Sequence, residues 1–263
     1  MTDIKPLALI TGASSGIGFE LARQFAENGF DLLVTAEDVG LGSAAEQLRT
    51  AGAQVQSVQA DLSTYDGVEQ LYAAILANGQ PVSVAALNAG VGQGGAFIDT
   101  DLADELQIID LNISSTVHLA KRLLKEMVAR QDGRVLITSS IASTMPGSFQ
   151  AVYNASKSFL QSFAEALQNE LKDTSVTITS LMPGPTDTNF FHRADMDDTL
   201  VGQGPKDDPA QVAKQGFDAL MNGKDKIVAG SLKTKAQGVA NKVLPDKLKA
   251  ATHRHMAEPG SGE

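Results

Sequence analysis

The segment that decides the fold reads LALITGASSGIG and covers residues 7–18. Residues 7–11 are largely apolar without alternation, as in a strand whose two faces are both covered, and the residues after the turn follow helical spacing. The turn contains three glycines and two serines: Gly12, Ser14, Ser15, Gly16 and Gly18. Glycine lets a pyrophosphate approach without a Cβ in the way, and the amides at the start of the helix face the anion. The segment therefore predicts a strand, a turn and a helix that bind a dinucleotide.

Short β-rich segments and helical stretches alternate along the chain. The predicted strands are residues 7–11, 31–36, 55–60, 82–88, 134–139, 176–182 and 226–229. The predicted helices are residues 16–28, 43–50, 67–78, 102–130, 153–171 and 209–221. Right-handed crossovers between such strands give a doubly wound parallel sheet, in which ligands bind at the carboxyl ends of the strands. We expect a single-domain α/β fold, a Rossmann-type sheet of about seven strands with helices on both faces.

The composition excludes several classes of protein. The 263 residues are 43% hydrophobic and carry a net charge of −10, with a pI near 4.9. A negative charge disfavours nucleic acid and anionic membranes as main partners, so we expect a small-molecule substrate. The chain has no cysteine, which excludes disulfides and thiol nucleophiles, and its four histidines lack metal-ligand spacing. Because the sequence shows no signal-like start and no long apolar run, we expect a cytoplasmic protein without a metal or a membrane span.

Tyr153 and Lys157 stand four residues apart in YNASK, on one face of a predicted helix. An unperturbed tyrosine has a pKa of about 10 and is a poor acid at neutral pH, so catalysis needs a shift of roughly two to three pH units. An ammonium about 4 Å from the phenolate contributes on the order of 4 kcal/mol at an effective dielectric constant near 20, which is the required size. The pair predicts a proton donor, although the same spacing arises by chance on many amphipathic helices.

Four motifs of this chain resemble those of the short-chain dehydrogenase/reductase family, in the same order and spacing. They are T-G-x-x-x-G-x-G at 11–18, N-A-G at 88–90, a serine at 140 and Y-x-x-x-K at 153–157. Each motif is weak alone, but their coincidence across most of the chain is specific. The resemblance implies an NAD(P)-dependent oxidoreductase that moves a hydride between the nicotinamide and a carbonyl or secondary alcohol carbon.

The resemblance also implies roles for individual residues. Tyr153 is the general acid and base, and Ser140 holds the substrate oxygen. Lys157 lowers the pKa of Tyr153 and binds the nicotinamide ribose. Asn112 distorts its helix and holds a water beside the lysine, a surface asparagine being the alternative. Neighbours on a strand point in opposite directions, so only one of Ser139 and Ser140 should face the nicotinamide, and the family's spacing to Tyr153 favours Ser140.

The residues that the resemblance implies for cofactor binding extend over six segments. They are Gly12, Ser14, Ser15, Gly16, Ile17, Gly18, Glu37, Asp61, Leu62, Asn88, Ala89, Gly90, Tyr153, Lys157, Pro183, Gly184 and Thr188. Asp61 is expected to contact the adenine, and the hydroxyl of Thr188 is expected to bind the carboxamide of the nicotinamide.

The cofactor preference follows from the residues around the glycine turn and the end of the second strand. NADPH-preferring family members carry a basic residue in one of these places to pair with the 2′-phosphate, whereas this chain has Ser15 and Glu37. Glu37 and Asp38 repel a phosphate and accept hydrogen bonds from a ribose 2′-hydroxyl. We therefore expect NAD(H) in preference to NADP(H). NADP(H) stays open, because Ala36 stands where NAD-selecting relatives carry an aspartate.

Two segments outside these motifs are expected to serve the substrate and assembly. Residues 189–205 correspond to the family's variable substrate lid within a domain that covers residues 1–230. Four apolar residues of the lid are expected to line a pocket, with core packing as the alternative for the two phenylalanines: Phe190, Phe191, Met196 and Leu200. Gly202 and Gly204 are candidate hinges, and His192 and Arg193 either contact a polar substrate group or face solvent.

Residues 231–263 are expected to form a basic, amphipathic extension of the same domain. Its predicted apolar side consists of Ala236, Val239, Ala240, Val243 and Leu244. Such a helix closes over the domain, joins a subunit contact, or binds an anionic partner. The long helices at 102–130 and 153–171 pair across a two-fold axis in the family, which implies a homodimer or a homotetramer.

The rival hypothesis is a dinucleotide-binding regulatory or scaffold protein of the same fold, since a fold alone does not establish a function. The complete set of Ser140, Tyr153 and Lys157 argues against it, because a non-catalytic protein has no physical reason to keep a buried lysine beside the tyrosine. Epimerase or dehydratase chemistry on a sugar nucleotide fits less well. Those relatives have a differently spaced glycine turn and a larger C-terminal region.

Overall fold

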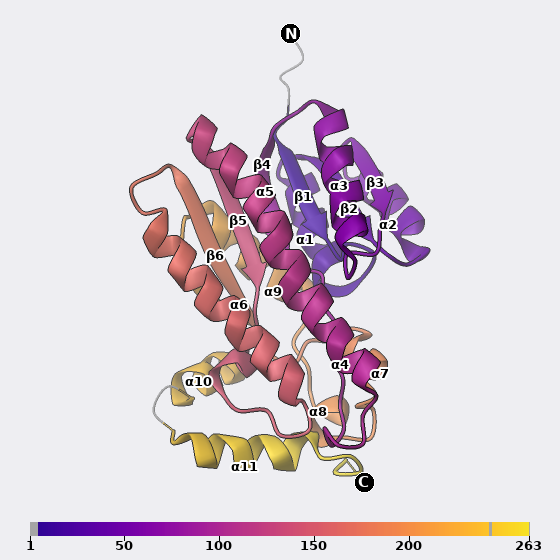
Figure 1. Cartoon of the computed structure of the whole chain (residues 1–263), viewed down its shortest axis with the longest axis vertical. Helices are drawn as coiled ribbons and strands as arrows, with labels where there is room; N and C mark the ends of the chain where they lie inside the picture. Colours follow the sequence, from indigo (N-terminus) through magenta and orange to yellow (C-terminus); the bar gives the residue numbers. More distant parts are fainter. Residues whose placement is uncertain (1–4, 242–243, 263) are drawn as a thin grey trace.

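A seven-stranded parallel sheet forms the centre of the computed structural model, which describes residues 5–241 and 244–262 (Figure 1). Its strands are β1 (Leu7–Thr11), β2 (Asp31–Ala36), β3 (Val55–Gln59), β4 (Val82–Leu87), β5 (Gly133–Thr138), β6 (Val176–Pro183) and β7 (Lys226–Ala229). The strand order is β3-β2-β1-β4-β5-β6-β7, and neighbouring strands run parallel. Each predicted strand is present with ends within one residue, and the Rossmann-type fold is confirmed.

Helices cover both faces of the sheet. One face carries α1 (Gly16–Glu27), α2 (Gly40–Thr50) and α9 (Pro209–Met221), and the other carries α3 (Tyr65–Asn78), α5 (Ser115–Arg130) and α6 (Ala151–Glu170). Successive residues of a strand point to opposite faces. In β1, Ala8 and Ile10 accordingly belong to the apolar core on the side of α1, α2 and α9. Leu7 and Leu9 belong to the core on the side of α3, α5 and α6. The absence of polar alternation in this strand thus reflects two apolar layers.

The strand order reverses at β1, whose neighbours are β2 on one side and β4 on the other. At such a switch point the connections leave in opposite directions and open a crevice outside the carboxyl ends of the strands. The glycine turn after β1 and the loops after β4 and β5 therefore converge at one end of the sheet (Figure 1).

The long helix predicted at 102–130 is interrupted. It consists of α4 (Leu102–Ile108), a π-helical segment η1 (Ile109–Ser114) and α5. Asn112 lies within η1 and is fully buried. The predicted distortion of the helix at Asn112 is present, and the surface alternative for this residue is wrong.

The predicted lid, residues 189–205, contains two short helices, α7 (Phe190–Arg193) and α8 (Leu200–Gln203). Met196 is fully buried against Phe191, Ala194 and Ala257, so its predicted place in the pocket lining is wrong and it belongs to a small core. A Cβ on Gly202 would lie 1.8 Å from the carbonyl oxygen of Met196. Gly202 therefore allows a close backbone approach, which is a reason for glycine that involves no hinge motion.

The C-terminal segment forms α10 (Leu232–Ala240) and α11 (Asp246–Ala257), which lie at the carboxyl end of the sheet (Figure 1). The predicted apolar side of α10 is wrong, because Ala236 and Ala240 are exposed while Thr234 and Gly238 are buried. A Cβ on Gly238 would lie 3.1 Å from the Val228 side chain, so this glycine lets α10 pack closely on β7. Leu244 is half-buried. Val243 and the side chain of Val239 lie outside what the structure describes.

Candidate active site

A cavity of about 530 Å³ opens at the carboxyl ends of the strands. It runs from the glycine turn past the ends of β4 and β5 to the lid and α11. The predicted site residues that line it are Gly12, Ser14, Ser15, Gly16, Ile17, Gly18, Glu37, Leu62, Asn88, Ala89, Gly90, Ser140, Tyr153, Lys157, Pro183, Gly184 and Thr188. Asp61 and Asn112 are not part of this lining.

The glycine turn has the shape that a dinucleotide phosphate requires. Gly12 and Gly16 have φ angles of +67° and +56°, which side chains rarely adopt. A Cβ on Gly18 would lie 2.0 Å from the carbonyl oxygen of Gly12, so only glycine lets α1 begin this close to the strand. Backbone amides at the start of α1 are left to bind an anion. The cradle fits the pyrophosphate of a nicotinamide dinucleotide.

The turn is joined to the neighbouring strands by threonine and asparagine side chains. The Thr11 hydroxyl oxygen accepts hydrogen bonds from the backbone N–H groups of Asn88 and Ala89, both 2.9 Å long. The hydroxyl of Thr138 donates to Oδ1 of Asn88 at 3.1 Å. Thr11 opens the predicted glycine motif but was given no role, and Thr138, the last residue of β5, was not predicted as a site residue. Together these bonds fix the relative positions of β1, β4 and β5.

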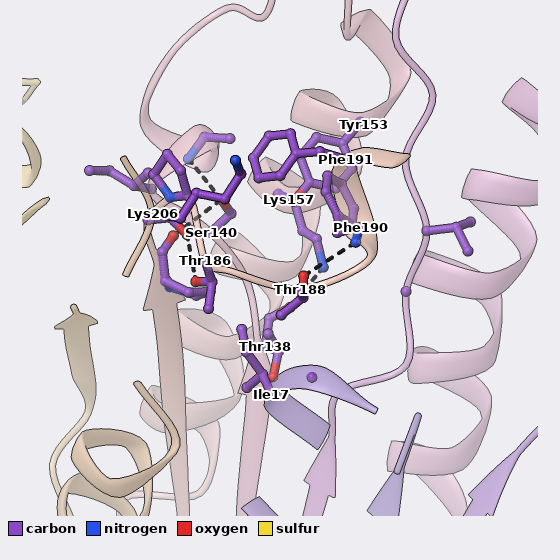
Figure 2. A pocket seen from close by; sticks show the side chains of 18 of the residues that line it. Ile17, Thr138, Ser140, Tyr153, Lys157, Thr186, Thr188, Phe190, Phe191 and Lys206 are labelled. Carbon is purple, nitrogen blue, oxygen red and sulfur yellow. Dashed lines mark hydrogen bonds between the residues drawn. The ribbon is translucent and has the colours of Figure 1, made fainter. Parts of the chain in front are cut away.

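Tyr153 and Lys157 lie in the first turns of α6, and their side chains point to the same pocket as Ser140 (Figure 2). The Lys157 side chain is buried, with a residue exposure of 4%. Its Nζ donates a hydrogen bond of 3.0 Å to the carbonyl oxygen of Thr138 and lies 5.7 Å from the centroid of the Tyr153 ring. A Cβ on Gly90 would lie 3.3 Å from this Nζ, so the glycine of the N-A-G motif makes room for the lysine.

Burial dominates the acid–base properties of the pair. It raises the pKa of Tyr153 to about 12, while the contact with Ser140 lowers the pKa of the phenol to a smaller extent. Burial also lowers the pKa of Lys157 to about 8. The net pKa shift of Tyr153 is therefore upward, opposite to the expected direction, because desolvation of the phenol is its largest cause. That Lys157 lowers the pKa of Tyr153 stays a prediction.

The two neighbouring serines after β5 have different surroundings. The Ser139 hydroxyl is buried and donates 2.9 Å to the carbonyl oxygen of Lys157, so it holds the backbone of α6. The Ser140 hydroxyl oxygen accepts from the N–H of Ala142 at 3.1 Å and donates to the carbonyl oxygen of Pro183 at 3.4 Å. Ser140 is the serine that lies close to the phenol of Tyr153. Both serines line the cavity, but the hydroxyl of Ser139 is bound to the backbone of α6 whereas that of Ser140 lies close to the phenol.

Asn112 lies behind the cavity wall rather than in it. Its Oδ1 accepts from the N–H of Val91 at 2.9 Å, and its Nδ2 donates to the carbonyl oxygen of Val91 and to Oγ of Ser156, both at 3.0 Å. Ser156 in turn donates to the carbonyl oxygen of Tyr153 at 2.7 Å. The side chain of Asn112 thus joins η1, the loop after β4 and the backbone of α6. Its role in a water relay stays a prediction.

The adenosine side of the cavity is acidic. Glu37 and Asp38 follow β2 and line the cavity. Oδ2 of Asp38 accepts a hydrogen bond of 2.6 Å from Ser14, and its Oδ1 accepts from the N–H of Gly40 at 2.9 Å. The Asp61 carboxylate is held by the N–H and hydroxyl of Ser63 instead, at 2.9 and 2.6 Å. The structure therefore brings Glu37 and Asp38, but not Asp61, into the cavity lining.

The loop after β6 approaches the glycine turn from the other side. A Cβ on Gly16 would lie 3.0 Å from Cγ2 of Thr188, so the predicted nicotinamide-side loop contacts the turn. Thr186 lines the cavity as well and was missed in the sequence, and Asp207 pairs with it in a short β-bridge. Figure 2 shows Thr186 and Thr188 among the residues that surround the pocket. These contacts bring the two ends of the predicted cofactor site together.

The lid places aromatic side chains over the tyrosine. The rings of Phe190 and Tyr153 lie 5.2 Å apart between centroids, and Phe191 packs edge-on against Phe190 at 5.5 Å. Phe190, Phe191 and Leu200 line the cavity, as one of the two expectations for the lid had it. The exposed Arg193 also lines it, whereas the exposed His192 binds Asp197 at 2.6 Å. The wall beside Tyr153 is therefore mainly apolar.

Five further residues line the cavity that were not predicted as site residues. They are Met145, Gln150, Lys206, His253 and Met256. α11 is docked here, because Nδ1 of His253 lies 2.9 Å from the carbonyl oxygen of Ser148 and Nζ of Lys249 donates 3.0 Å to the carbonyl oxygen of Thr144. No local motif marks these residues. They reach the cavity only through the packing of the C-terminal segment.

Known proteins are similar to this chain in sequence and in architecture. A family model described as short chain dehydrogenase matches residues 6–199. A putative ketoacyl reductase of Streptomyces coelicolor is 34% identical over 71% of this chain and 73% of its own length. A Sphingobium yanoikuyae short-chain dehydrogenase in complex with NADPH is 26% identical, covers 85% of this chain and 87% of its own, and superposes with a TM-score of 0.79.

A second solved structure shows the same fold with the other cofactor. It is a short chain dehydrogenase/reductase from Burkholderia phymatum in complex with NAD, which is 24% identical and has a TM-score of 0.81. It covers 92% of this chain and 94% of its own. Proteins of this architecture thus carry either nicotinamide cofactor.

Residues 5–241 and 244–262 contain neither a candidate metal site nor a candidate membrane-spanning helix. No group of three or more His, Asp or Glu side chains in these ranges is arranged to hold a metal ion. Likewise, none of the helices described is long and apolar enough to cross a lipid bilayer.

Proposed function

Because this chain belongs to the short-chain dehydrogenase family, we propose that Tyr153, Ser140, Lys157 and Asn112 carry its catalysis. The protein is an NAD(P)-dependent oxidoreductase that transfers a hydride between nicotinamide and a carbonyl or secondary alcohol. The observation that supports the assignment of residues is the convergence of Ser140, Tyr153 and Lys157 in one cavity, which also contains the glycine cradle. The bound nicotinamide supplies the hydride in reduction and accepts it in oxidation.

Each of the four proposed catalytic residues has its own role. Tyr153 donates its phenolic proton to the carbonyl oxygen in reduction and takes a proton from the alcohol in oxidation. Ser140, which lies close to the phenol, donates a hydrogen bond to the same substrate oxygen and stabilises the charge that develops there. Lys157 binds the nicotinamide ribose and supplies positive charge beside the phenolate. Asn112 fixes the backbone of α6 and completes the proton path.

Burial keeps the phenol of Tyr153 protonated, and its high pKa has to be offset by nearby positive charge when the proton is transferred. A phenol whose pKa is raised to about 12 is protonated across the physiological range, so the proton donor is present. Its acceptor, a developing alkoxide, is a stronger base than the phenolate. Ser140 and Lys157 then stabilise the phenolate that remains after transfer.

We propose that the enzyme uses NAD(H) in preference to NADP(H). Glu37 is exposed at the end of β2, and the Asp38 carboxylate is fixed beside Ser14 at 2.6 Å. Both carboxylates disfavour a 2′-phosphate and offer acceptors to a 2′-hydroxyl. The cations that line the cavity belong to other segments: Lys157, Arg193, Lys206 and Lys233.

We further propose a homodimer or a homotetramer that associates through α4 and α6. Large apolar side chains are exposed on α4 and α6, at the start of η1 and in the loop before α4. They are Leu102 and Leu106 of α4, Phe159 of α6, Ile109 of η1, and Phe97 and Ile98 of the loop. Contiguous exposed apolar residues of this kind mark contact surfaces. Light scattering on the purified protein tests this, and a mass equal to the 27.6 kDa of one chain would contradict it.

Two further expectations are kept as proposals. A cytoplasmic location fits a chain that has no cysteine for disulfides. Residues 231–263 are proposed to be an extension of the domain formed by 1–230, since Lys249 and His253 bind the segment that precedes α6.

The experiment that tests the proposed function follows the absorbance of the reduced cofactor. Ketones, sugars, steroids and acyl thioesters are screened with NADH and with NADPH, and the corresponding alcohols with the oxidised cofactors. Turnover of at least one carbonyl class supports an oxidoreductase. Binding of dinucleotide without turnover of any class would favour the regulatory alternative.

A further inference from the structure

The amide of Gln150 is buried in the cavity wall without a protein partner. Gln150 lines the cavity with an exposure of 7%, and its Nε2 has no hydrogen-bond partner among the described residues. The residue occupies the N-cap of α6, yet its side chain makes no capping bond. A buried amide without a hydrogen-bond partner is unfavourable for folding. Because the amide serves neither the helix nor a neighbouring side chain, its position in the cavity wall points to a ligand.

His253 supplies a second polar atom to the same wall. The residue lines the cavity and is 6% exposed. Its Nδ1 lies 2.9 Å from the carbonyl oxygen of Ser148, and since a carbonyl only accepts, Nδ1 carries the proton. Burial lowers the pKa of His253 and thereby favours the neutral ring. In this tautomer Nε2 is a hydrogen-bond acceptor, and no described residue donates to it.

α11 is docked on the segment that carries Gln150, and both Gln150 and His253 line the cavity that contains Tyr153. Ser148, which anchors the imidazole, is two residues before Gln150, and its hydroxyl donates 3.3 Å to the carbonyl oxygen of Ala250. Gln150 is also three residues before Tyr153 in the sequence and directly precedes the first residue of α6. The two polar groups therefore belong to the cavity of the proposed proton donor.

We propose that Gln150 and His253 form a subsite for a hydroxyl group of the substrate, so that the enzyme acts on hydroxyketones and the matching diols. A hydroxyl accepts a hydrogen bond from Nε2 of Gln150 and donates one to Nε2 of His253, which satisfies both groups. The inference rests on the proposed function and specifies its substrate.

The experiment compares matched ketones that differ by one hydroxyl. The pairs are 4-hydroxy-2-butanone with 2-butanone and 2-hydroxycyclohexanone with cyclohexanone. For the unmodified enzyme we expect kcat/KM to be at least about tenfold higher with the hydroxyketone, because the plain ketone leaves the buried amide of Gln150 unpaired. Gln150→Leu and His253→Phe are each expected to reduce this ratio to below about threefold. The ratio is the readout, because a merely structural change affects both ketones of a pair alike.

His255→Phe is the matched control on the same helix, since His255 is exposed and does not line the cavity. It is expected to keep the ratio of the unmodified enzyme. Equal kcat/KM values for both ketones in the unmodified enzyme would overturn the subsite, and so would an unchanged ratio in both cavity variants. These outcomes differ from failure of the proposed function, which would appear as full turnover in Tyr153→Phe.

A binding measurement covers the case in which the probes turn over too slowly. Imidazole ¹⁵N spectra of the complex with oxidised cofactor are recorded with each hydroxyketone and each plain ketone. We expect Nε2 of His253 to shift with the hydroxyketone alone and not to shift in Gln150→Leu to the same extent. An Nε2 resonance that responds to neither probe, or equally to both, would overturn the subsite.

Discussion

Lys157 donates a hydrogen bond of 3.0 Å from Nζ to the carbonyl oxygen of Thr138, which ties α6 to the carboxyl end of β5. The bond keeps a buried ammonium within 5.7 Å of the centre of the Tyr153 ring. Gly90 leaves the space that the ammonium occupies. The site thus contains a cation that is costly for folding and has one backbone acceptor, which is an arrangement expected where charge serves a reaction.

Replacing Lys157 by methionine is predicted to change how stability depends on pH. Burial lowers the pKa of Lys157 from 10.5 to about 8, so between these values the unfolded chain binds a proton that the folded chain does not. The free energy of unfolding therefore gains a contribution that rises with pH across this window, to about 3 kcal/mol in all. Below about pH 8 the burial penalty is present in full.

Denaturant titrations of the unmodified enzyme and Lys157→Met at several pH values check this. The variant is expected to be the more stable of the two at neutral pH, and the difference is expected to shrink as pH rises above about 8. A difference that stays constant over this range would contradict the assigned cause. Turnover by the variant is expected to be lost at every pH.

The two serines after β5 are predicted to respond differently to loss of the hydroxyl. Ser140→Ala removes the group that lies close to the phenol of Tyr153 together with its bonds to Ala142 and Pro183. We therefore expect kcat to fall about 10²–10³-fold and stability to fall by about 1 kcal/mol. Ser139→Ala removes a hydrogen bond to the backbone of Lys157 and is expected to cost about 1 kcal/mol of stability with a smaller loss of kcat. Kinetics and thermal unfolding of both variants test the pair. Interchanged effects would show that Ser139 is the serine that binds the substrate oxygen.

A charge reversal after β2 is predicted to change the cofactor preference. Glu37 is exposed and lines the cavity, so Glu37→Arg is expected to fold normally and to provide a partner for a 2′-phosphate. We expect kcat/KM with NADPH to rise at least about tenfold and kcat/KM with NADH to fall. Glu170→Arg makes the same charge change at an exposed position outside the cavity and serves as the control. A similar rise in both variants would assign the effect to net charge.

The strands and the glycine turn were predictable because their signals are local. The apolar segment 7–11 and the turn at 12–18 determine their own conformation, and alternation of strands and helices then leaves few topologies. The site residues Ser140, Tyr153 and Lys157 were implied by the resemblance to the short-chain dehydrogenase family, which rests on the order and spacing of the motifs along the chain. The structure places all three in the cavity lining.

Features that depend on tertiary packing were not predictable. The apolar spacing of Ala236 and Ala240 indicated a buried side, but the close approach of Gly238 to Val228 buries the opposite side of α10. Met196 is apolar and was expected in the pocket lining, yet it packs in a small core with Ala257 of α11. Gln150 and His253 are more than a hundred residues apart and carry no motif. Desolvation likewise has no local signal, so the pKa shift of Tyr153 was expected in the wrong direction.

The central claim is that the phenolic proton of Tyr153 is transferred in the reaction. Tyr153→Phe keeps the ring that packs on Phe190 and removes only the hydroxyl. The most direct measurement determines kcat with a turned-over carbonyl together with the dissociation constant of the dinucleotide from fluorescence titration. We predict a loss of kcat of at least about 10²-fold, with dinucleotide affinity changed less than about threefold. Undiminished kcat in Tyr153→Phe would contradict the account.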